Sequence, residues 1–316
     1  MREAIDDAAA VLRKGGLVAF PTETVYGLGA LARDPKAVAR IFAAKGRPAN
    51  HPLIVHLAEA ADVPRWAARI PANASKLMER FWPGPLTVIL DKREDVPDAV
   101  TGGQDTIGLR VPAHEVANAL LRAVGDGLAA PSANRFGAVS PTTAAHVALE
   151  LGPQVDRILD GGACRVGIES TIVRVTDEGV SLLRPGAVTR VALEAEVGAL
   201  RTHDPAIRAP GTLASHYAPR ASVVVVDGAR LEQSLSESHR GTVILSAAPV
   251  EGHPHIPLSS TPELAARQLY AALREVDARG YHRALVVLPS AAGIGEAVVD
   301  RIRRAAAQRD DLTPRD

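Results

Sequence analysis

The sequence is poor in cysteine and aromatic residues, carries no excess of either charge and has no long hydrophobic run. Its single cysteine, Cys164, cannot form an internal disulfide, and no CxxC pair is present for zinc, so a reducing compartment fits. The 36 Lys and Arg residues balance 36 Asp and Glu residues, which argues against a dominant nucleic-acid or membrane surface. No apolar run reaches the ~20 residues that span a bilayer, and the acidic, amphipathic N-terminus is unlike a secretory signal. We therefore expect a soluble cytoplasmic protein with no membrane partner.

What is present is an ample supply of aliphatic residues. Apolar residues make up 47% of the 316 residues and aromatic residues only 3%, so aliphatic side chains must fill the cores. A chain of this length is near the upper size for a single core, so we expect two domains.

The first 200 residues alternate between helical and extended patterns. The threonine-rich stretch at 21–29 is interpreted as a turn, and the runs at 157–160, 171–175 and 181–183 are expected to pair antiparallel, which gives a twisted mixed sheet with flanking helices. The expected helices are 5–12, 36–45, 74–81, 114–124, 142–151 and one near Leu193; the other expected strands are 17–20, 53–57, 86–90, 107–111 and 128–130.

A stretch rich in Pro and Gly at 201–221 has turn chemistry and little periodicity, so we expect it to be a linker. Beyond it, residues 222–316 alternate strands and helices of the lengths found in a small, Rossmann-like parallel sheet. The expected strands are 223–226, 243–245 and 284–288; the expected helices are 231–238, 262–279 and 296–309.

Four cations stand at the ends of predicted elements. Lys45 and Arg47 follow a helix end, where they can either satisfy the last carbonyls or hold phosphate. Arg110 and Arg184 each end an apolar strand directly before or near a proline, so each projects from a sheet edge. Because open sheets bind ligands at strand ends, we expect the four cations to converge on one polyanion.

Hydroxyl and amide side chains accompany these cations. Ser132 and Asn134, in PSAN, are turn formers that could also reach a phosphate or a nucleoside, and Ser132 lies outside any G-x-S-x-G elbow. Other hydroxyl residues lie in segments that His56 and Arg110 could face. These hydroxyls, the histidine and the arginine could together form a pocket that binds an amino acid. These hydroxyl residues are Thr22, Thr24, Ser170 and Thr171.

No protein metal site is expected. His51 and His56 would point to opposite faces of a strand, and His253 and His255 form only a weak metal candidate in a proline-rich loop. The Gly293-Ile-Gly295 segment lacks the third glycine of a dinucleotide fingerprint.

With these residues assembled, the chain resembles the L-threonylcarbamoyladenylate synthase family, in its long two-domain form with a YrdC-like first domain. The resemblance covers the whole length, and so many segments in order are highly specific. The matching segments are PTETVYGLG, KGRPANHPLIVH, FWPGPLT, TIGLRVP, PSAN with Ser140, GIESTIV, LLRPGAV and APGTLASHYAP.

The resemblance implies a YrdC-like catalytic domain at 1–200, a linker at 201–221 whose SHYAP segment lies over the active site, and a small α/β domain at 222–316. It also implies an enzyme that converts L-threonine, bicarbonate or CO2, and ATP to threonylcarbamoyl-AMP and pyrophosphate. That product feeds the threonylcarbamoyladenosine modification of tRNA through a downstream transferase complex.

The resemblance further implies roles for individual residues. The threonine pocket corresponds to Thr24, His56, Arg110, Ser132 and Ser170. The ATP contacts correspond to Arg47, His51, Thr106, Ala130, Ser132, Ser140, Arg184 and Tyr217, joined by Lys45 and, from its place in PSAN, Asn134. Many relatives have Asn where this chain has His51, although a histidine can also donate a hydrogen bond.

The implied chemistry fits a site without a nucleophile. A carbamate of threonine attacks the α-phosphorus of ATP, and such transfers depend on positioning and charge neutralisation by Lys45, Arg47, Arg110 and Arg184. Mg²⁺ is expected with ATP, held by phosphates and water. Tyr217 is expected to act as part of a lid.

Two alternatives remain open at this stage. One is a non-catalytic protein that binds double-stranded RNA or tRNA, which the near-zero charge of both parts disfavours: residues 1–200 carry 22 Lys/Arg and 23 Asp/Glu, and the remainder 36 − 22 = 14 and 36 − 23 = 13. The other is carbamoyl transfer as in hydrogenase-maturation proteins, whose zinc-finger and acylphosphatase segments this sequence lacks.

Overall fold

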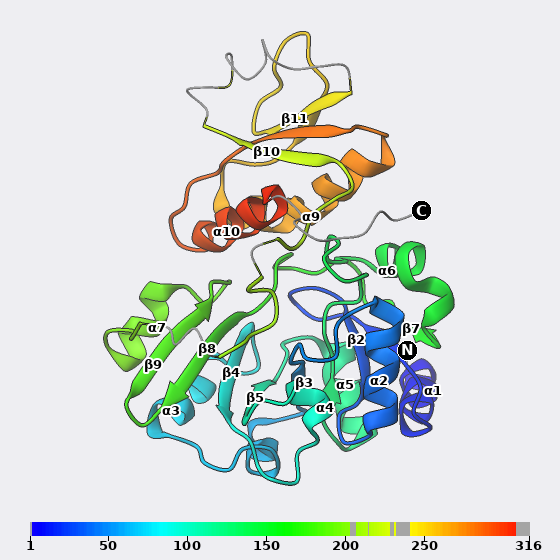
Figure 1. Ribbon diagram of the computed structural model, residues 1–316, viewed down its shortest axis with the longest axis vertical. Coiled ribbons are helices and arrows are strands. Elements are labelled where there is room, and N and C mark those ends of the chain that lie inside the picture. The colour runs from blue at the N-terminus through cyan, green and yellow to red at the C-terminus, as the bar shows by residue number, and fades with distance from the viewer. Residues whose placement is uncertain (1, 203–206, 214, 228–230, 232–240, 308–316) are drawn as a thin grey trace. The chain divides into compact units, whose positions relative to one another are not determined.

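The computed structural model describes residues 2–202, 207–213, 215–227, 231 and 241–307, and it divides into two compact units (Figure 1). Unit 1 comprises Met1–Phe136 and Ser140–Thr212, and unit 2 comprises Gly137–Val139 and Leu213–Asp316. The division therefore falls inside the segment that the sequence marks as a linker. The assignment of residues 137–139 to unit 2 has no counterpart in the sequence analysis.

Unit 1 contains a nine-stranded mixed sheet and surrounding helices. The strands are β1 (Val18–Phe20), β2 (Gly27–Leu31), β3 (Ile54–His56), β4 (Leu86–Asp91), β5 (Thr106–Arg110), β6 (Leu128–Ala129), β7 (Arg157–Ile158), β8 (Thr171–Thr176) and β9 (Gly179–Arg184). The helices are α1 (Arg2–Arg13), α2 (Pro35–Lys45), η1 (Ala60–Arg65), α3 (Ala72–Phe81), α4 (Asp98–Thr101), α5 (Glu115–Val124), α6 (Ala144–Leu151), η2 (Gly152–Gln154) and α7 (Arg190–Val197).

The strand order is β7-β1-β2-β6-β3-β5-β4-β8-β9. The sheet contains both parallel pairs, such as β3 with β5 and β4 with β8, and antiparallel pairs, such as β4 with β5, so the predicted mixed sheet is confirmed. The prediction that the run at 157–160 pairs antiparallel with its two successors is wrong. β7 instead pairs parallel with β1 at the opposite edge of the sheet from β8 and β9.

Strand β2 lies where the sequence suggests a turn. Its two glycines fit the aromatic ring of Phe20 on the neighbouring strand: a Cβ on Gly29 would come within 2.7 Å of that ring, and a Cβ on Gly27 within 3.5 Å. Glycine is unfavourable in strands unless another group approaches closely, and here the ring does. The segment between β1 and β2, residues 21–26, is the turn that the threonine-rich pattern indicates.

The two faces of the large sheet have different cover. Val55, Leu109, Val88 and Val173 belong to the largest core cluster, which includes residues of α2 and α3. Successive strand residues point to opposite faces, so Ile54 and His56 face the other way from Val55. On that second face α1 and α5 cover the β1 end, and the chain at 207–209 packs on Ile54, Ile89 and Ile172. The sheet surface between these two covers is where the candidate site lies.

The described residues of unit 2 contain a four-stranded parallel sheet, which confirms the predicted parallel sheet and adds one strand to the three expected. The strands are β10 (Ser222–Val226), β11 (Thr242–Ser246), β12 (His255–Pro257) and β13 (Arg283–Val287), in the order β10-β13-β11-β12, with helices α9 (Pro262–Ala278) and α10 (Gly295–Ala306). Strand β12 was not expected, because its Pro-rich sequence is typical of a loop. The helix predicted at 231–238 lies almost wholly outside the described residues.

Strand β12 explains one of the two histidines considered as metal candidates in unit 2. His255 lies in that strand and its Nε2 is 3.0 Å from the carbonyl oxygen of Ser246, so it has a structural partner. Across the described chain, no three His, Cys, Asp or Glu side chains are grouped so that they could bind a metal ion. In the same residues no helix has the length and apolar character needed to cross a bilayer.

Candidate active site

Residues from five strands of unit 1 line up on the second face of the large sheet. His56 pairs with Arg110 across β3 and β5, Thr87 pairs with Ile172 across β4 and β8, and Ile172 pairs with Arg184 across β8 and β9. Paired residues point to the same face of a sheet. Because Leu109 is paired with Val88 in the antiparallel strands β5 and β4, their neighbours Arg110 and Thr87 also point to one common face. The strand register thus places His56, Arg110, Thr87 and Arg184 along one row.

His56 is a buried, neutral member of this row. Burial, with the adjacent charge of Arg110 as the next cause, lowers the pKa of His56 to about 3. Its ring stands edge-on to Phe20, with centroids 6.0 Å apart, and its Nδ1 has no hydrogen-bond partner among the described residues. A neutral imidazole can accept a hydrogen bond at one ring nitrogen and donate at the other.

Arg110 meets a carboxylate that was not identified from the sequence. Its Nη2 lies 2.7 Å from Oε1 of Glu23, and the side chains of both residues are 4% exposed. Its Nε donates a hydrogen bond of 3.3 Å to the carbonyl oxygen of Gly84. Glu23 stands between Thr22 and Thr24, whose hydroxyls are 2.8 Å apart, so the turn at 21–26 brings a carboxylate to the row, with Thr24 next to it in the chain.

Lys45 is placed by the end of helix α2. Asp34 caps the start of this helix, and Gly46 ends it with φ 61°, a conformation that glycine adopts without strain. The buried Lys45 Nζ donates hydrogen bonds of 2.5 Å to the carbonyl oxygens of Ser132 and Asn134. Burial, and then the charge of Arg47, hold the pKa of Lys45 well below its usual 10.5. The end of α2 therefore holds Lys45 against the PSAN loop and near Arg47.

Arg47 and His51 both lie close to the ring of Phe136. The Arg47 guanidinium is 5.7 Å from the Phe136 ring centroid, and the His51 ring is 5.3 Å from it. Arg47 also donates a 2.9 Å hydrogen bond to the carbonyl oxygen of Pro52. Burial lowers the pKa of His51, with smaller effects from Arg47 and Arg208. His51 is thus kept neutral near neutral pH and beside two guanidinium groups.

Ser170 connects the row to Arg184. The Ser170 hydroxyl is 2.8 Å from the hydroxyl of Thr87, and Arg184 donates to the Ser170 carbonyl and hydroxyl oxygens at distances of 2.9 Å and 3.1 Å. Arg184 also donates a 2.8 Å hydrogen bond to the carbonyl oxygen of Pro210. The strand-end arginine therefore fixes both a predicted substrate residue and the chain at 207–210.

Glu169 connects Lys45 electrostatically with the segment that contains Ser170. It directly precedes Ser170, accepts a 2.6 Å hydrogen bond from the hydroxyl of Ser140, and its charge acts on Lys45. Through these contacts the described structure links Lys45 to Arg184, whereas the strand register links Arg184 to Arg110. Arg110 and Arg184 therefore share one sheet face, and Lys45, with Arg47 acting on it, is connected to them through the charge of Glu169.

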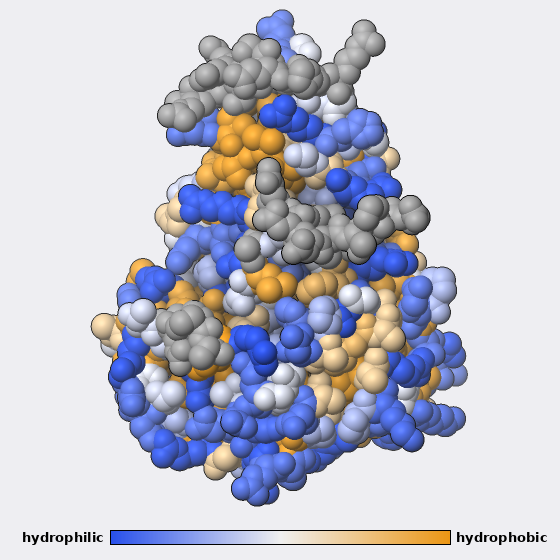
Figure 2. Space-filling model, viewed as in Figure 1, coloured by the Kyte–Doolittle hydropathy of each residue, from blue (hydrophilic) through white to orange (hydrophobic). Residues whose placement is uncertain are grey.

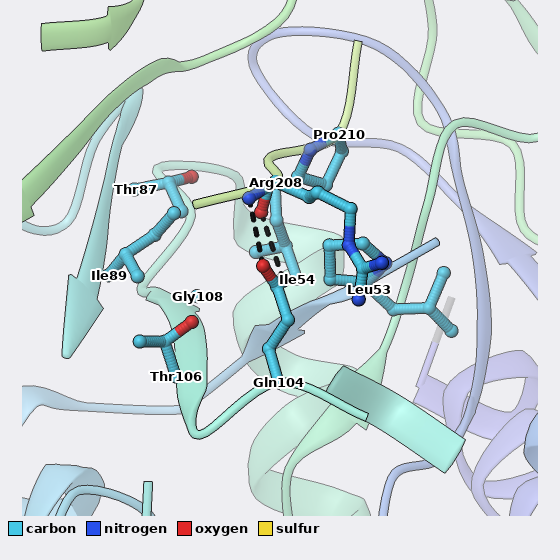
Figure 3. A pocket seen from close by; sticks show the side chains of 10 residues that line it. Leu53, Ile54, Thr87, Ile89, Gln104, Thr106, Gly108, Arg208 and Pro210 are labelled. Carbon is cyan, nitrogen blue, oxygen red and sulfur yellow. Dashed lines mark hydrogen bonds between the residues drawn. The ribbon is translucent and has the colours of Figure 1, made fainter. Parts of the chain in front are cut away.

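A small pocket opens on this face (Figure 3). Ile54, Gly108 and Ile89 form part of its wall. Thr106, a predicted ATP contact, lines it, as do Thr87 and Pro210. Ala130, another predicted ATP contact, lies next to the wall, since its N–H donates a 2.9 Å hydrogen bond to the carbonyl oxygen of Ile54.

The side of the pocket formed by residues 208–210 is fastened by a reciprocal amide contact. The Arg208 N–H donates to Gln104 Oε1 at 2.8 Å, and Gln104 Nε2 donates to the Arg208 carbonyl at 3.1 Å, the two dashed lines in Figure 3. Arg208 also donates a 2.9 Å hydrogen bond to the carbonyl oxygen of Gly102. These residues, which the sequence assigns to a linker, are part of unit 1.

Tyr217 belongs to unit 2. Its ring is 1% exposed, stacks on Tyr270 at 5.7 Å and lies 5.3 Å from the guanidinium of Arg301. Its φ of 62° is in the left-handed region, which is unusual for a residue with a side chain. Its role over the predicted site remains a prediction.

The residues that sequence reasoning missed are mostly neighbours of residues that it found. Glu23 is next to Thr24, and Glu169 is next to Ser170. Each stands in a segment of small and hydroxyl residues, where a lone carboxylate is the signal that could have identified it. Thr87, in FWPGPLT, carried no comparable signal.

The side of the molecule drawn in Figure 2 is mainly hydrophilic, with apolar residues in scattered patches.

Two family models match the chain. The model described as "Telomere recombination", for proteins of the Sua5, YciO and YrdC type, matches residues 10–186, and the model described as "Threonylcarbamoyl-AMP synthase, C-terminal domain" matches residues 181–307.

Individual relatives match over almost the whole length. A threonylcarbamoyl-AMP synthase of Pyrococcus abyssi is 42% identical over 98% of this chain and 97% of its own. The Bacillus subtilis enzyme of the same name is 38% identical over 96% of this chain and 93% of its own. The crystal structure of P. abyssi Sua5 complexed with L-threonine is 41% identical, has a TM-score of 0.92, and matches over 97% of this chain and 95% of that one.

Proposed function

This chain belongs to the threonylcarbamoyl-AMP synthase family, and we propose from that premise that it converts L-threonine, bicarbonate or CO2, and ATP to threonylcarbamoyl-AMP and pyrophosphate. The observation that carries the proposal is that Arg110 and Arg184 share one sheet face beside buried hydroxyls, while the charge of Glu169, the neighbour of Ser170, acts on Lys45. The relative whose structure holds L-threonine supports threonine as the substrate.

In this proposal the row of residues on the sheet binds threonine. Arg110 pairs with the α-carboxylate, and the neutral His56 and the hydroxyls of Thr24 and Ser170 hold the rest of the molecule. All of these groups are buried, so charge interactions there are stronger than in water. Ser132, whose carbonyl accepts a hydrogen bond from Lys45, is proposed to complete this pocket.

ATP then lies against the cations and the pocket. Arg47, Lys45 and Arg184 neutralise charge that builds on the leaving pyrophosphate, and a guanidinium and an ammonium are the groups that grip phosphoryl oxygens best. The pocket lined by Thr106 takes part of the nucleotide, with Ala130, Asn134, Ser140 and His51 around it.

The reaction needs no protein nucleophile. The amino group of threonine takes up CO2, and an oxygen of the resulting carbamate attacks the α-phosphorus of ATP while pyrophosphate leaves. The chain contributes by holding both reactants in line and by excluding water from the mixed anhydride. Mg²⁺ bound to ATP would take its ligands mainly from phosphates and water and would share in the charge neutralisation.

We place this activity in the cytoplasm, where the product would pass to a downstream transferase complex that modifies tRNA. Tyr217 is proposed to close over the nucleotide as part of a lid.

Pyrophosphate release from ATP, measured with and without L-threonine and bicarbonate, tests the proposal, with serine and glycine as control amino acids. We expect release to require threonine and bicarbonate. Arg47→Ala should reduce the threonine-dependent rate by at least about a hundredfold, the range seen when a transition-state charge contact is removed, with an unchanged circular dichroism spectrum. Threonine-independent behaviour together with salt-sensitive RNA binding would instead support the non-catalytic alternative.

A further inference from the structure

The Glu23 carboxylate is buried beside the proposed threonine site without the hydrogen bonds that such a group needs. The residue is 3% exposed, and neither carboxylate oxygen accepts a hydrogen bond from a described residue. The 2.7 Å contact of Oε1 with Arg110 has the distance of an ion pair but lacks the alignment of a hydrogen bond, and Arg110 Nη2 likewise makes none. Buried polar groups in this condition are rare, and a catalytic role is one recognised reason for them.

A third unsatisfied group lies at the same place. His56 is paired with Arg110 in the sheet, and its Nδ1 has no partner among the described residues. One unpartnered nitrogen on a neutral ring, one carboxylate and one guanidinium therefore share a small buried region. This combination is complementary to a zwitterion, which brings a carboxylate, an ammonium and hydrogen-bonding groups within one small molecule.

We propose that Glu23 binds the α-ammonium group of threonine and then accepts its proton, so that the neutral amine can take up CO2. This inference rests on the proposed function and assigns a role to a residue outside the predicted site. The threonine carboxylate replaces Glu23 as the partner of Arg110, and Glu23 turns its charge to the ammonium group.

The charges balance at each step. Before proton transfer, Arg110 and the ammonium carry two positive charges, and Glu23 and the substrate carboxylate carry two negative charges. In the transfer one N–H bond of the ammonium breaks and one O–H bond forms on Glu23. A neutral amine and a neutral carboxyl remain, and Arg110 stays paired with the substrate carboxylate. Because each arrangement has no net charge, none leaves an isolated buried charge, which would be costly.

The first test compares L-threonine with 2,3-dihydroxybutanoate, in which a hydroxyl replaces the ammonium group. Binding of both is measured by calorimetry in the full-length protein, in Glu23→Gln and in Asp156→Asn. Asp156 is a suitable control because it pairs with Arg40 at 2.9 Å and binds the Leu17 N–H, at the start of β1 rather than at its site end. The wild type and Asp156→Asn should prefer threonine by about a hundredfold or more, as sites that pair a polar substrate group do.

Glu23→Gln should reduce that preference to within about threefold, chiefly by weakening threonine binding, because the charge-assisted contact is lost. Equal weakening of both ligands, or an unchanged preference, would overturn the role of Glu23. If Glu23→Gln fails to fold, Glu23→Asp serves instead: its oxygens recede by one methylene, so the preference should fall, and an unchanged preference overturns the proposal.

The second test is the pH dependence of threonine-dependent pyrophosphate release at saturating threonine. In Glu23→Gln the amine must lose its proton to solvent, so the rate should rise about tenfold per pH unit below the pKa of the amine. The wild-type rate should be flatter over the same range, and parallel profiles would contradict proton acceptance by Glu23. Failure of the wild type to bind threonine or to release pyrophosphate would contradict the proposed function itself, whereas a normal wild type with unaffected Glu23 variants contradicts only this inference.

Discussion

His56 and Arg110 occupy paired positions on the parallel strands β3 and β5, and burial together with this guanidinium lowers the pKa of His56 to about 3. The imidazole is therefore neutral in the folded protein, while in the unfolded chain it titrates near its ordinary value of 6.5. Between these two pH values the unfolded state binds one more proton than the folded state. The contribution of His56 to the free energy of unfolding is therefore fully present above pH 6.5, and it is lost as the pH falls toward 3.

A prediction about acid sensitivity follows from that pairing. Between pH 7 and pH 5, His56 should lower the free energy of unfolding by about 2 kcal/mol, since each pH unit in the window is worth about 1.4 kcal/mol. Urea denaturation of the wild type and His56→Gln at both pH values measures the effect. The variant should lose about 2 kcal/mol less than the wild type, because the other titrating groups act in both proteins. Parallel losses would show that His56 is protonated in the folded state.

Gly108 offers a test of the pocket that leaves the fold intact. A Cβ at this strand position would lie 3.4 Å from Thr87 Cγ2 and 3.6 Å from Ile54 Cγ1, which are ordinary packing distances. Gly108→Ala should therefore fold and gain about 0.5–1 kcal/mol, the usual benefit of removing a strand glycine. The added methyl group fills the wall of the pocket, so the KM for ATP should rise about fivefold or more if nucleotide binds there, by analogy with other one-methylene changes in pockets.

The control for this variant is Gly152→Ala, where a Cβ would meet nothing within 4 Å. Steady-state pyrophosphate release should give wild-type values for ATP with this control. A Gly108→Ala enzyme with an unaltered KM for ATP would place the nucleotide elsewhere.

The elements that sequence could predict are those with local signals. Asp34 and Gly46 mark the two ends of α2, and the helix forms between them, so the position of Lys45 follows from short-range chemistry. Strand pairing depends on partners far along the chain instead. The pairing of β7 with β1 was missed for this reason, and β2 was missed because its glycines are explained only by the ring of Phe20.

The candidate site divides in the same way. Arg110 and Arg184 could be singled out because each stands at the end of an apolar strand beside a proline, and the register then places both on one face. Glu23 was not singled out: its lone carboxylate among hydroxyl residues is only a weak local signal, and its significance comes from burial against Arg110, a tertiary contact. The packing of residues 207–210 on the sheet was hidden by their Pro and Gly content, which is equally typical of a free linker.

Ser140 should be important through Glu169. Its hydroxyl donates a 2.6 Å hydrogen bond to Glu169 Oε1, and both side chains are buried. Ser140→Ala removes a donor from a buried carboxylate, so we expect a loss of about 1–3 kcal/mol in the free energy of unfolding and a higher KM for ATP. Chemical denaturation and steady-state kinetics measure the two effects.

Ser181→Ala is the matched control for Ser140. Its hydroxyl donates to the carbonyl oxygen of Thr202 at 3.2 Å in an exposed position, so its removal should change stability by less than about 0.5 kcal/mol. Similar behaviour of the two variants would remove Ser140 from the site.

The proposed lid is best tested by removing one atom from Tyr217. The Tyr217 ring is buried against Tyr270 and Arg301 within unit 2, so Tyr217→Ala would leave a cavity and weaken that unit by about 3–5 kcal/mol, as other buried aromatic truncations do. Tyr217→Phe keeps the ring and removes only the hydroxyl. We expect it to raise the KM for ATP about tenfold, the value of one hydrogen bond to a charged group, and to lower the ratio of threonylcarbamoyl-AMP to pyrophosphate as water reaches the anhydride. Tyr270→Phe removes a hydroxyl from the ring stacked on Tyr217 and should leave both quantities unchanged. Wild-type values of KM and product ratio for Tyr217→Phe would mean that this hydroxyl does not act on the nucleotide.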